Sequence, residues 1–176
     1  MSQLSALSLS IAILGAIWAY LALGPLSGDV LVWAGFIAWG CYFHTGANSN
    51  ALTKTIVGTA YGAFIGWIAL LIIVNVAIPS LGTAWPAIVV GVTVFFLVIV
   101  ASINLLSVVP ANVYGYAAIV AYSLQTTPPP PLTGPLQNLT SGSFANPLIL
   151  LIVSLVVGAI FGMLSNKLAG ALAKKV

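Results

Sequence analysis

The sequence predicts an all-α integral membrane protein whose six transmembrane helices form a 3+3 inverted-topology repeat. Three observations support this fold class. Of the 176 residues, 61% are hydrophobic and only 3% are charged, and the mean hydropathy is +1.20. The apolar residues gather in successive runs, and one stripe of small residues occurs twice. Because a soluble domain needs a charged surface, we expect lipid to be the solvent for most of this chain.

Apolar runs bounded by Gly, Pro, Asn and Ser predict the six helices. In chain order the runs cover residues 4–23, 30–44, 51–78, 84–106, 111–124 and 147–168. Helices are required because lipid offers no partner to backbone N–H and C=O groups, and the alternating pattern of a barrel strand is absent. The first run has about the 20 residues needed to span and no Lys or Arg before it, so we predict a membrane helix and not a cleaved signal.

Length distinguishes the second and fifth runs from the others. Each has about 14–15 apolar residues, or roughly 22 Å at a rise of about 1.5 Å per residue, against a hydrocarbon core of about 30 Å. Short segments at matching positions of two inverted halves indicate a membrane substrate site. Tilted neighbours and a locally thinned bilayer are an equally good explanation of the mismatch.

The segment 125–146, QTTPPPPLTGPLQNLTSGSFAN, is polar and rich in proline. The run from Pro128 to Pro131 favours a polyproline conformation and excludes a membrane helix. We therefore predict a loop on the outer face, inserted between the fifth and sixth helices.

The distribution of charge predicts the orientation. Six spans put both termini on one side of the membrane, together with all the lysines, which are Lys54, Lys167, Lys174 and Lys175. Asp29 falls on the opposite side. Since lysine marks the cytoplasmic side of membrane loops, both termini are expected in the cytoplasm.

An internal repeat relates the two halves of the chain. The stripes of the third and sixth helices align at an offset of 96 residues, which pairs Gly58 with Ser154, Gly62 with Gly158 and Gly66 with Gly162. The same offset pairs Asn50 with Asn146, and each is expected to cap its helix. At an offset of 80 the second and fifth helices align, which pairs Gly35 with Gly115, Phe36 with Tyr116, Ala38 with Ala118 and Tyr42 with Tyr122.

Two units of three helices, 1–80 and 81–176, explain both offsets. An odd number of helices in each unit inverts the second unit across the membrane, as in many transporters. Small residues at every fourth position let helix backbones approach closely in lipid, where no hydrophobic force drives association. We therefore expect the third and sixth helices to cross near a pseudo-twofold axis, one stripe against the other.

Composition excludes most enzyme chemistry. One histidine, one cysteine and one acidic residue do not supply the usual ligands of a metal site, and the sequence contains no Ser/His/Asp group or phosphate-binding glycine loop. The lysines form no basic face for a nucleic acid. We expect no enzymatic activity, no cofactor and no metal.

Neutral polar and aromatic side chains are the remaining candidates for a substrate path. Ion-coupled carriers use a buried carboxylate, and no acidic residue lies within a span, so passive movement of an uncharged solute is expected. The candidate path residues are Trp39, Tyr42, His44, Asn48, Asn50, Trp67, Asn112, Tyr114, Tyr116, Tyr122 and Asn146. Helix capping is the alternative role of the asparagines. His44 is also the sole candidate pH sensor, because histidine changes protonation near neutral pH.

The run WAGFIAWGCYFHTGANSN, followed by GTAYGAFIGW, resembles the YcdZ-like family of small bacterial inner-membrane proteins, a domain of unknown function. The resemblance implies a multi-span protein of the bacterial inner (plasma) membrane and supplies no substrate or functional residues. In size and lack of charge the chain is also similar to small urea and amide channels, in architecture alone.

The leading hypothesis is a passive channel or uniporter for a small uncharged polar solute of the urea, short amide, ammonia or water type. The path would lie at the interface of the two repeats, in a homo-oligomer held in the lipid bilayer. One alternative is an anion or weak-acid channel that uses Lys54 or His44. The other is a non-transporting membrane subunit or scaffold, in which the glycine stripes serve assembly.

Overall fold

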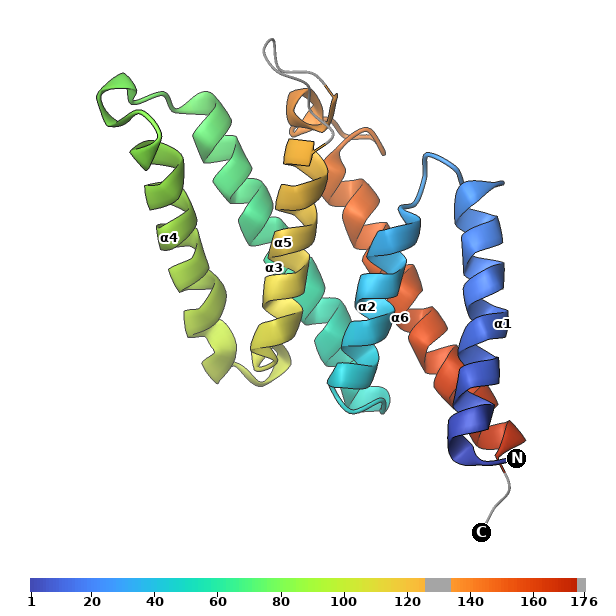
Figure 1. The fold of residues 1–176 in the computed structure, drawn as a ribbon. Coiled ribbons are helices and arrows are strands. Elements are labelled where there is room, and N and C mark those ends of the chain that lie inside the picture. The colour runs from blue at the N-terminus through green and yellow to red at the C-terminus, as the bar shows by residue number, and fades with distance from the viewer. Residues whose placement is uncertain (126–133, 174–176) are drawn as a thin grey trace.

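A computed structural model describes residues 1–125 and 134–173 of the chain (Figure 1). The described residues are helical apart from turns and one isolated bridge between Ser27 and Val30. The α-helices are α1 (Gln3–Leu23), α2 (Val32–His44), α3 (Ser49–Asn75), α4 (Ala84–Ile99), α5 (Val109–Gln125) and α6 (Pro147–Leu172). Short 3₁₀ helices join them: η1 (Pro79–Leu81), η2 (Val100–Ser102), η3 (Asn104–Leu106) and η4 (Gly134–Asn138).

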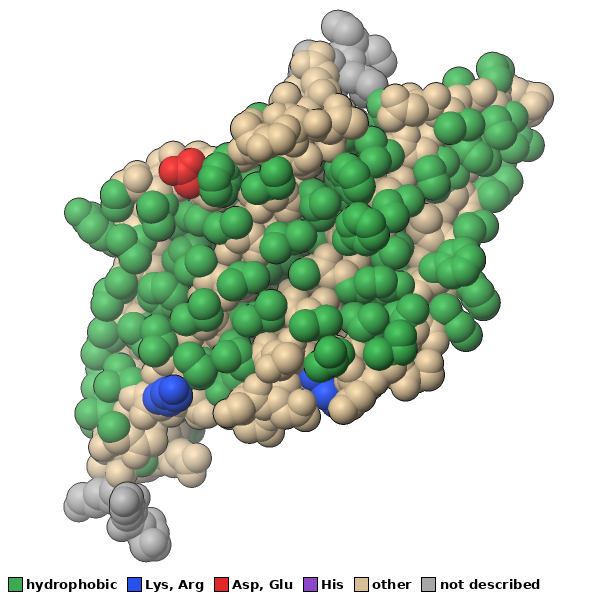
Figure 2. Space-filling model, turned by 180° about the vertical axis from the view of Figure 1, so that it is seen from behind, with side chains coloured by type: hydrophobic (Ala, Val, Ile, Leu, Met, Phe, Trp, Pro, Cys, Tyr) green, Lys and Arg blue, Asp and Glu red, His purple; other side chains and the backbone are tan. Residues whose placement is uncertain are grey.

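Successive α-helices run in opposite directions, and the described parts of both chain ends lie at the same end of the molecule (Figure 1). Lys54 is in the first turns of α3 and Lys167 is near the end of α6, whereas Asp29 lies between α1 and α2. Figure 2 shows lysine side chains toward the end that holds the chain ends and an acidic side chain at the opposite end. The proline run, Lys174 and Lys175 lie outside the described residues. The described charges therefore separate by end in the way that the sequence predicts.

Four stretches of the described chain are long and apolar enough to cross a membrane. They are α1, α3, Ala84–Ser102 and α6, with 21, 27, 19 and 26 residues. On the face shown in Figure 2, apolar side chains cover most of the surface between the two ends. Large apolar side chains such as Phe95 and Phe96 are 60% and 54% exposed. This surface is compatible with a membrane protein, since lipid does not penalise exposed apolar groups.

The two remaining α-helices are shorter than these four stretches, although α5 is one residue longer than α4 without η2. α2 has 13 residues and α5 has 17. At about 1.5 Å per residue they measure roughly 20 Å and 25 Å, less than a hydrocarbon core of about 30 Å. The predicted short segments therefore exist as short helices.

The helix contacts follow one pattern in both halves. α3 packs mainly on α5, and α6 packs mainly on α2, while α4 lies against α3 and α1 against α6. Exchanging α1, α2 and α3 for α4, α5 and α6 leaves this pattern unchanged. Each half therefore inserts its third helix beside the short helix of the other half.

The third and sixth helices, α3 and α6, contact each other as predicted, but their glycine stripes do not face each other, so that part of the prediction is wrong. On α3, a Cβ atom added at Gly62 would clash with the backbone of Asn112 in α5, and Gly66 faces Ile119. On α6, Gly158 lies against the backbone of Gly35 in α2. A stripe permits close approach to any smooth backbone, so the short helices, and not the other stripe, occupy it.

Asparagine caps begin α3 and α6, one of them not at the predicted residue. The Asn146 side chain accepts from Leu148 N at 2.9 Å, as expected. At α3 the cap is Asn48, which accepts from Ala51 N at 2.8 Å, whereas Asn50 lies exposed in the first turn. The backbone of Asn48 is extended, as a capping residue requires, and that of Asn50 is already helical.

Trp18 fastens α1 to the rest of the molecule. Its ring is fully buried, and its Nε1 donates to Val32 O at 2.9 Å, at the start of α2. The ring lies on Gly35, where an added Cβ would come within 2.5 Å of it. Trp18 therefore belongs to the interior of the helix bundle.

Candidate functional site

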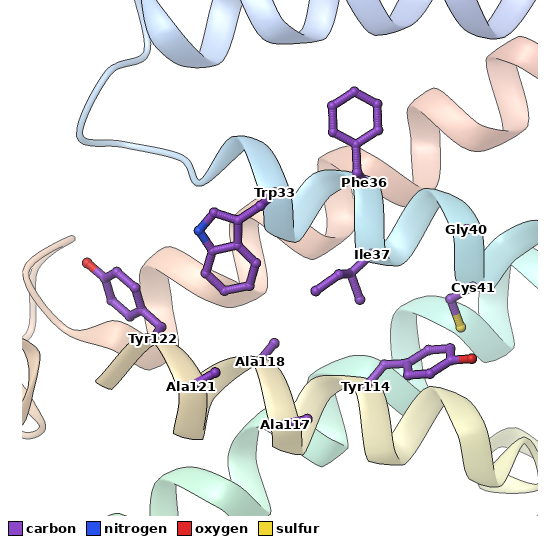
Figure 3. A pocket seen from close by; sticks show the side chains of 10 residues that line it. All are labelled: Trp33, Phe36, Ile37, Gly40, Cys41, Tyr114, Ala117, Ala118, Ala121 and Tyr122. Atoms are coloured by element: carbon purple, nitrogen blue, oxygen red, sulfur yellow. The ribbon is translucent and has the colours of Figure 1, made fainter. Parts of the chain in front are cut away.

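The two short helices, α2 and α5, lie side by side and enclose a groove of about 720 Å³ (Figure 3). From α2 it is lined by Trp33, Phe36, Ile37, Gly40 and Cys41, and from α5 by Tyr114, Ala117, Ala118, Ala121 and Tyr122. These positions recur at intervals of three and four residues, so each helix presents one face to the groove. We call this space the α2–α5 groove.

Aromatic contacts join α2 and α5 at both ends of the groove. At one end the rings of Trp33 and Tyr122 lie with their centroids 6.3 Å apart. At the other end the Tyr114 hydroxyl and His44 Nδ1 are 3.2 Å apart, and their rings meet edge to face at 6.1 Å. The two contacts bound the groove along the helix axes.

The middle of the groove is apolar and partly open. Ile37 points toward α5 and Ala118 toward α2, whereas Phe36 points away from α5 (Figure 3) and lies near Gly15 of α1. At Gly40 an added Cβ would meet no atom within 4 Å, so the groove has room beside this residue. Ala118 is 3% exposed and belongs to the hydrophobic core, so the core forms the floor of the groove.

Few polar atoms reach the groove. They belong to the hydroxyls of Tyr114 and Tyr122, the indole of Trp33 and the thiol of Cys41. Cys41 is buried, and its Sγ lies 3.9 Å from Thr45 Oγ1. The lining contains no charged side chain. The groove therefore has a low polarity with a hydrogen-bonding group toward each end.

Three of the predicted path residues belong to this site. Tyr114 and Tyr122 line the groove, and His44 bonds to Tyr114 at its end. Trp39 and Tyr42, on the opposite face of α2, pack on Gly162 of α6 instead.

Hydrogen bonds hold Trp39 and Tyr42 in the interface with α6. Trp39 Nε1 donates to Ser165 Oγ at 3.0 Å, and Asn166 Nδ2 donates to the Tyr42 hydroxyl at 3.4 Å. The same Asn166 nitrogen also donates to Ala47 O at 2.8 Å. These side chains stabilise the contact between α2 and α6, a role that the sequence reading assigned to none of them.

Asn112 and Tyr116 point from α5 toward α4. Asn112 is fully buried, and its Nδ2 donates to Leu97 O and Leu106 O at 3.3 and 3.1 Å. The Tyr116 hydroxyl lies 3.0 Å from Thr93 Oγ1. Asn112 Oδ1 is buried without a hydrogen-bond partner among the described residues. Both side chains therefore hold α4 against the bundle, and the stretch that contains α4 is the least buried of the four candidate spans.

Trp67 and the asparagines at the helix starts lie away from the groove. Trp67 Nε1 and Asn146 Nδ2 both donate to Leu139 O, at 2.8 and 3.0 Å. They tie the segment after η4 to α3 and α6. Asn48 caps α3, and Asn50 is exposed at the same end.

Sequence reasoning missed most of the groove lining. It selected polar and large aromatic residues, whereas the walls include Ile37, Gly40, Ala117 and Ala121. The available signal was the spacing of the two short runs, in which positions 33, 36, 37, 40 and 41 and positions 114, 117, 118, 121 and 122 define one face each. The lining of these two faces contains no lysine, arginine or carboxylate.

Within the described residues, no group of three or more His, Cys, Asp or Glu side chains is placed to hold a metal ion. Lys54 lies outside the groove, with its Nζ donating to Ser107 Oγ at 3.0 Å. The chemistry available in the groove is therefore ring stacking, apolar contact and hydrogen bonding to hydroxyl groups.

Comparison with known families gives one match. The model of a family described as "Protein of unknown function (DUF1097)" matches residues 8–170, which cover the chain except for its two ends. No curated protein and no solved structure matches the chain significantly. The match confirms a family of unknown function, and the narrower resemblances to YcdZ-like proteins and to urea or amide channels stay predictions.

Proposed function

The chain belongs to the DUF1097 family, and we propose that it is a passive channel or uniporter for a small uncharged polar solute, built from two inverted three-helix units. The observation that carries this proposal is the α2–α5 groove. It lies between the two short helices, which occupy corresponding positions in the two halves. In transporters with inverted repeats, substrate sites lie at the interface of the repeats and involve such short or broken helices.

The inverted repeat has support from both sequence and packing. The halves align at offsets of 80 and 96 residues, and successive helices alternate in direction. The exchange of α1, α2 and α3 for α4, α5 and α6 also preserves the pattern of helix contacts. The α2–α5 contact maps onto itself under this exchange, so the groove would lie on the pseudo-twofold axis.

The lining favours an uncharged solute. Moving a charge into an apolar site costs several kcal/mol unless a partner neutralises it. The groove offers no charged side chain, and Asp29 and Lys54 lie toward opposite ends of the molecule. The same absence of carboxylates argues for passive movement, since no group in the groove is placed to bind a coupling proton or sodium ion.

We also propose a membrane, an orientation and an oligomeric state for the protein. The protein would lie in the bacterial inner membrane with both termini in the cytoplasm, where lysine-bearing ends are favoured. A groove open on one side needs a cover that excludes lipid from a polar solute, so the transporting form would be a homo-oligomer.

A non-transporting subunit or scaffold is the second candidate. It is favoured by the hydrogen bonds of Trp39, Trp67, Asn112 and Asn146, which all serve to hold helices or loops together. In this case the groove would be an assembly surface and no solute would move.

Flux through reconstituted liposomes separates the two candidates. We expect urea, acetamide, glycerol or nicotinamide to enter liposomes that contain the protein faster than empty liposomes. Gly40→Leu should reduce this flux, because the new side chain would fill the groove. Gly91→Leu is the matched control, since Gly91 is an exposed glycine of α4 with no atom near its Cβ position. If liposomes with natively helical wild-type protein showed the same flux as empty liposomes for every solute, the transport proposal would be overturned. The scaffold role would then be the better explanation.

A further inference from the structure

The α2–α5 groove is much larger than the narrow pores that select solutes by width. Its volume is about 720 Å³, whereas one water molecule occupies about 30 Å³ in the liquid. Channels that select water-sized or ammonia-sized solutes do so by pore width. Pockets of about 300–1,000 Å³ instead bind organic molecules. The groove therefore has room for a solute larger than water, ammonia or urea.

The shape of the lining indicates a flat solute. Aromatic side chains bound the groove at both ends, with Trp33 and Tyr122 at one end and Tyr114 at the other. Between them one part of the wall is nearly smooth, because Gly40, Ala117 and Ala121 project little or no side chain, whereas Ile37 points toward α5. Aromatic rings stack in offset or edge-to-face arrangements with planar partners. A planar ring satisfies both the smooth part of the wall and the aromatic ends.

The polar side chains of the lining determine where a bound solute can form hydrogen bonds. The Tyr114 hydroxyl is paired with His44 Nδ1 at 3.2 Å, and a phenolic oxygen with one partner keeps capacity for another. The middle of the groove has only alkyl groups to offer. A solute with polar atoms all around its ring would leave some unpaired there, which is costly. Hydrogen-bonding side chains lie toward both ends of the groove, Tyr114 at one end and Trp33 and Tyr122 at the other, so the polar atoms of the solute are confined to its two ends.

We propose that the α2–α5 groove binds an uncharged planar heterocycle with hydrogen-bonding groups at its two ends, as in a pyridine carboxamide. This inference rests on the proposed function, because it names the solute class of the same groove. Such a compound is polar enough to need a route across lipid and flat enough to lie between α2 and α5.

Saturation-transfer NMR with nicotinamide as the probe tests the inference on the full-length protein in nanodiscs. We expect saturable binding with a Kd of about 1 mM or tighter, a range that suits a ligand of few heavy atoms. Acetamide, which carries the amide without the ring, should bind at least about tenfold more weakly, because ring contacts are lost.

Gly40→Leu should weaken nicotinamide binding at least about tenfold, since overpacking a filled site costs one or more factors of ten. Gly91→Leu should leave binding within about twofold, and equal melting temperatures of the two variants exclude a folding defect. Binding that does not saturate in the wild type, as when acyl chains of the nanodisc fill the groove, would overturn the inference. Equal affinity for acetamide, or for the Gly40→Leu variant, would overturn it as well.

The two proposals fail in different ways. Saturable nicotinamide binding without faster flux of any solute supports the ligand class and overturns transport. Faster flux of urea or glycerol without nicotinamide binding supports transport and overturns the ligand class.

Discussion

Gly158 of α6 lies against the backbone of Gly35 of α2, so these helices touch backbone to backbone where they cross. An equivalent crossing is formed by α3 and α5. Gly62 of α3, which the 96-residue offset pairs with Gly158, lies against the backbone of α5. Gly115 of α5, which the 80-residue offset pairs with Gly35, lies against the backbone at Thr59. Each crossing joins a helix of one half to a helix of the other half, so the halves hold each other together.

Gly158→Leu should therefore destabilise the protein strongly. A Cβ at this position would overlap the backbone of Gly35, and a backbone cannot move aside as a flexible side chain can. We expect a loss of at least about 1–3 kcal/mol in the free energy of unfolding, as for other overpacked interiors. The melting temperature of the purified protein in detergent measures this loss.

Gly170→Leu is the matched control for this substitution. Gly170 lies on the same helix, and nothing lies within 4 Å of its Cβ position. Leucine is a better helix former than glycine by about 1 kcal/mol, so this variant should melt at the same or a higher temperature. Equal destabilisation by both variants would contradict the close crossing of α6 and α2.

The sequence predicts the number and place of the helices because each apolar run has one way to satisfy its backbone in lipid. The run 51–78 becomes α3, Ser49–Asn75, and the run 147–168 becomes α6, Pro147–Leu172. Their ends shift by a few residues, since Asn48 and Asn50 are equally good caps in sequence and tertiary contacts choose between them. The apolar runs thus predict that each helix exists more accurately than they predict its first and last residues.

The partners of the helices are not predictable in the same way. The stripe of Gly58, Gly62 and Gly66 predicts that another helix backbone approaches closely, but it does not predict which helix. The groove is not predictable for a related reason. Gly40 and Ala117 are residue types common in any membrane helix, so nothing in the sequence marks them as part of a site. Polar candidates such as Asn112 and Trp67 draw attention in a sequence, and they serve here in packing.

Trp39→Phe should lower stability, whereas Trp33→Phe in the same helix should not. Trp39 is 3% exposed, and its indole donates to Ser165 Oγ. Phenylalanine removes this donor and leaves a smaller ring, which costs about 1 kcal/mol or more. Trp33 is more exposed and borders the groove. Urea or thermal unfolding of both variants measures the difference, and similar curves would contradict the assignment of Trp39 to the interface with α6.

Asn112→Asp should disrupt the attachment of α4. The substitution replaces the amide that donates to Leu97 O and Leu106 O by a carboxyl group in a fully buried position. Losing buried hydrogen bonds costs about 1–3 kcal/mol, and more if the new group is ionised. Asn50→Asp, at an exposed position, is the control and should have little effect. Faster proteolysis in the η2–η3 segment of Asn112→Asp would locate the damage at the end of α4.

Cysteine labelling tests the alternation of the helices across the membrane. In a Cys41→Ala background, Ser27→Cys between α1 and α2 and Asn50→Cys at the start of α3 are both exposed. A membrane-impermeant maleimide should label Ser27→Cys on intact cells and Asn50→Cys only after permeabilisation, because lysine-bearing ends face the cytoplasm. The reverse result would refute the predicted orientation, and labelling of both on intact cells would refute the span of α2.

Tyr114→Phe and Tyr116→Phe separate the groove from the packing of α5. Both changes remove one hydroxyl from the same helix. Tyr114 borders the groove beside His44, whereas Tyr116 is buried toward α4 with its hydroxyl on Thr93. We expect Tyr114→Phe to weaken nicotinamide binding about threefold to tenfold, the value of one hydrogen bond, with an unchanged melting temperature. Tyr116→Phe should instead lower the free energy of unfolding by about 1 kcal/mol and leave binding unchanged. If Tyr116→Phe alone weakened binding, the solute would lie on the α4 side of α5, and the groove between α2 and α5 would lose its assigned role.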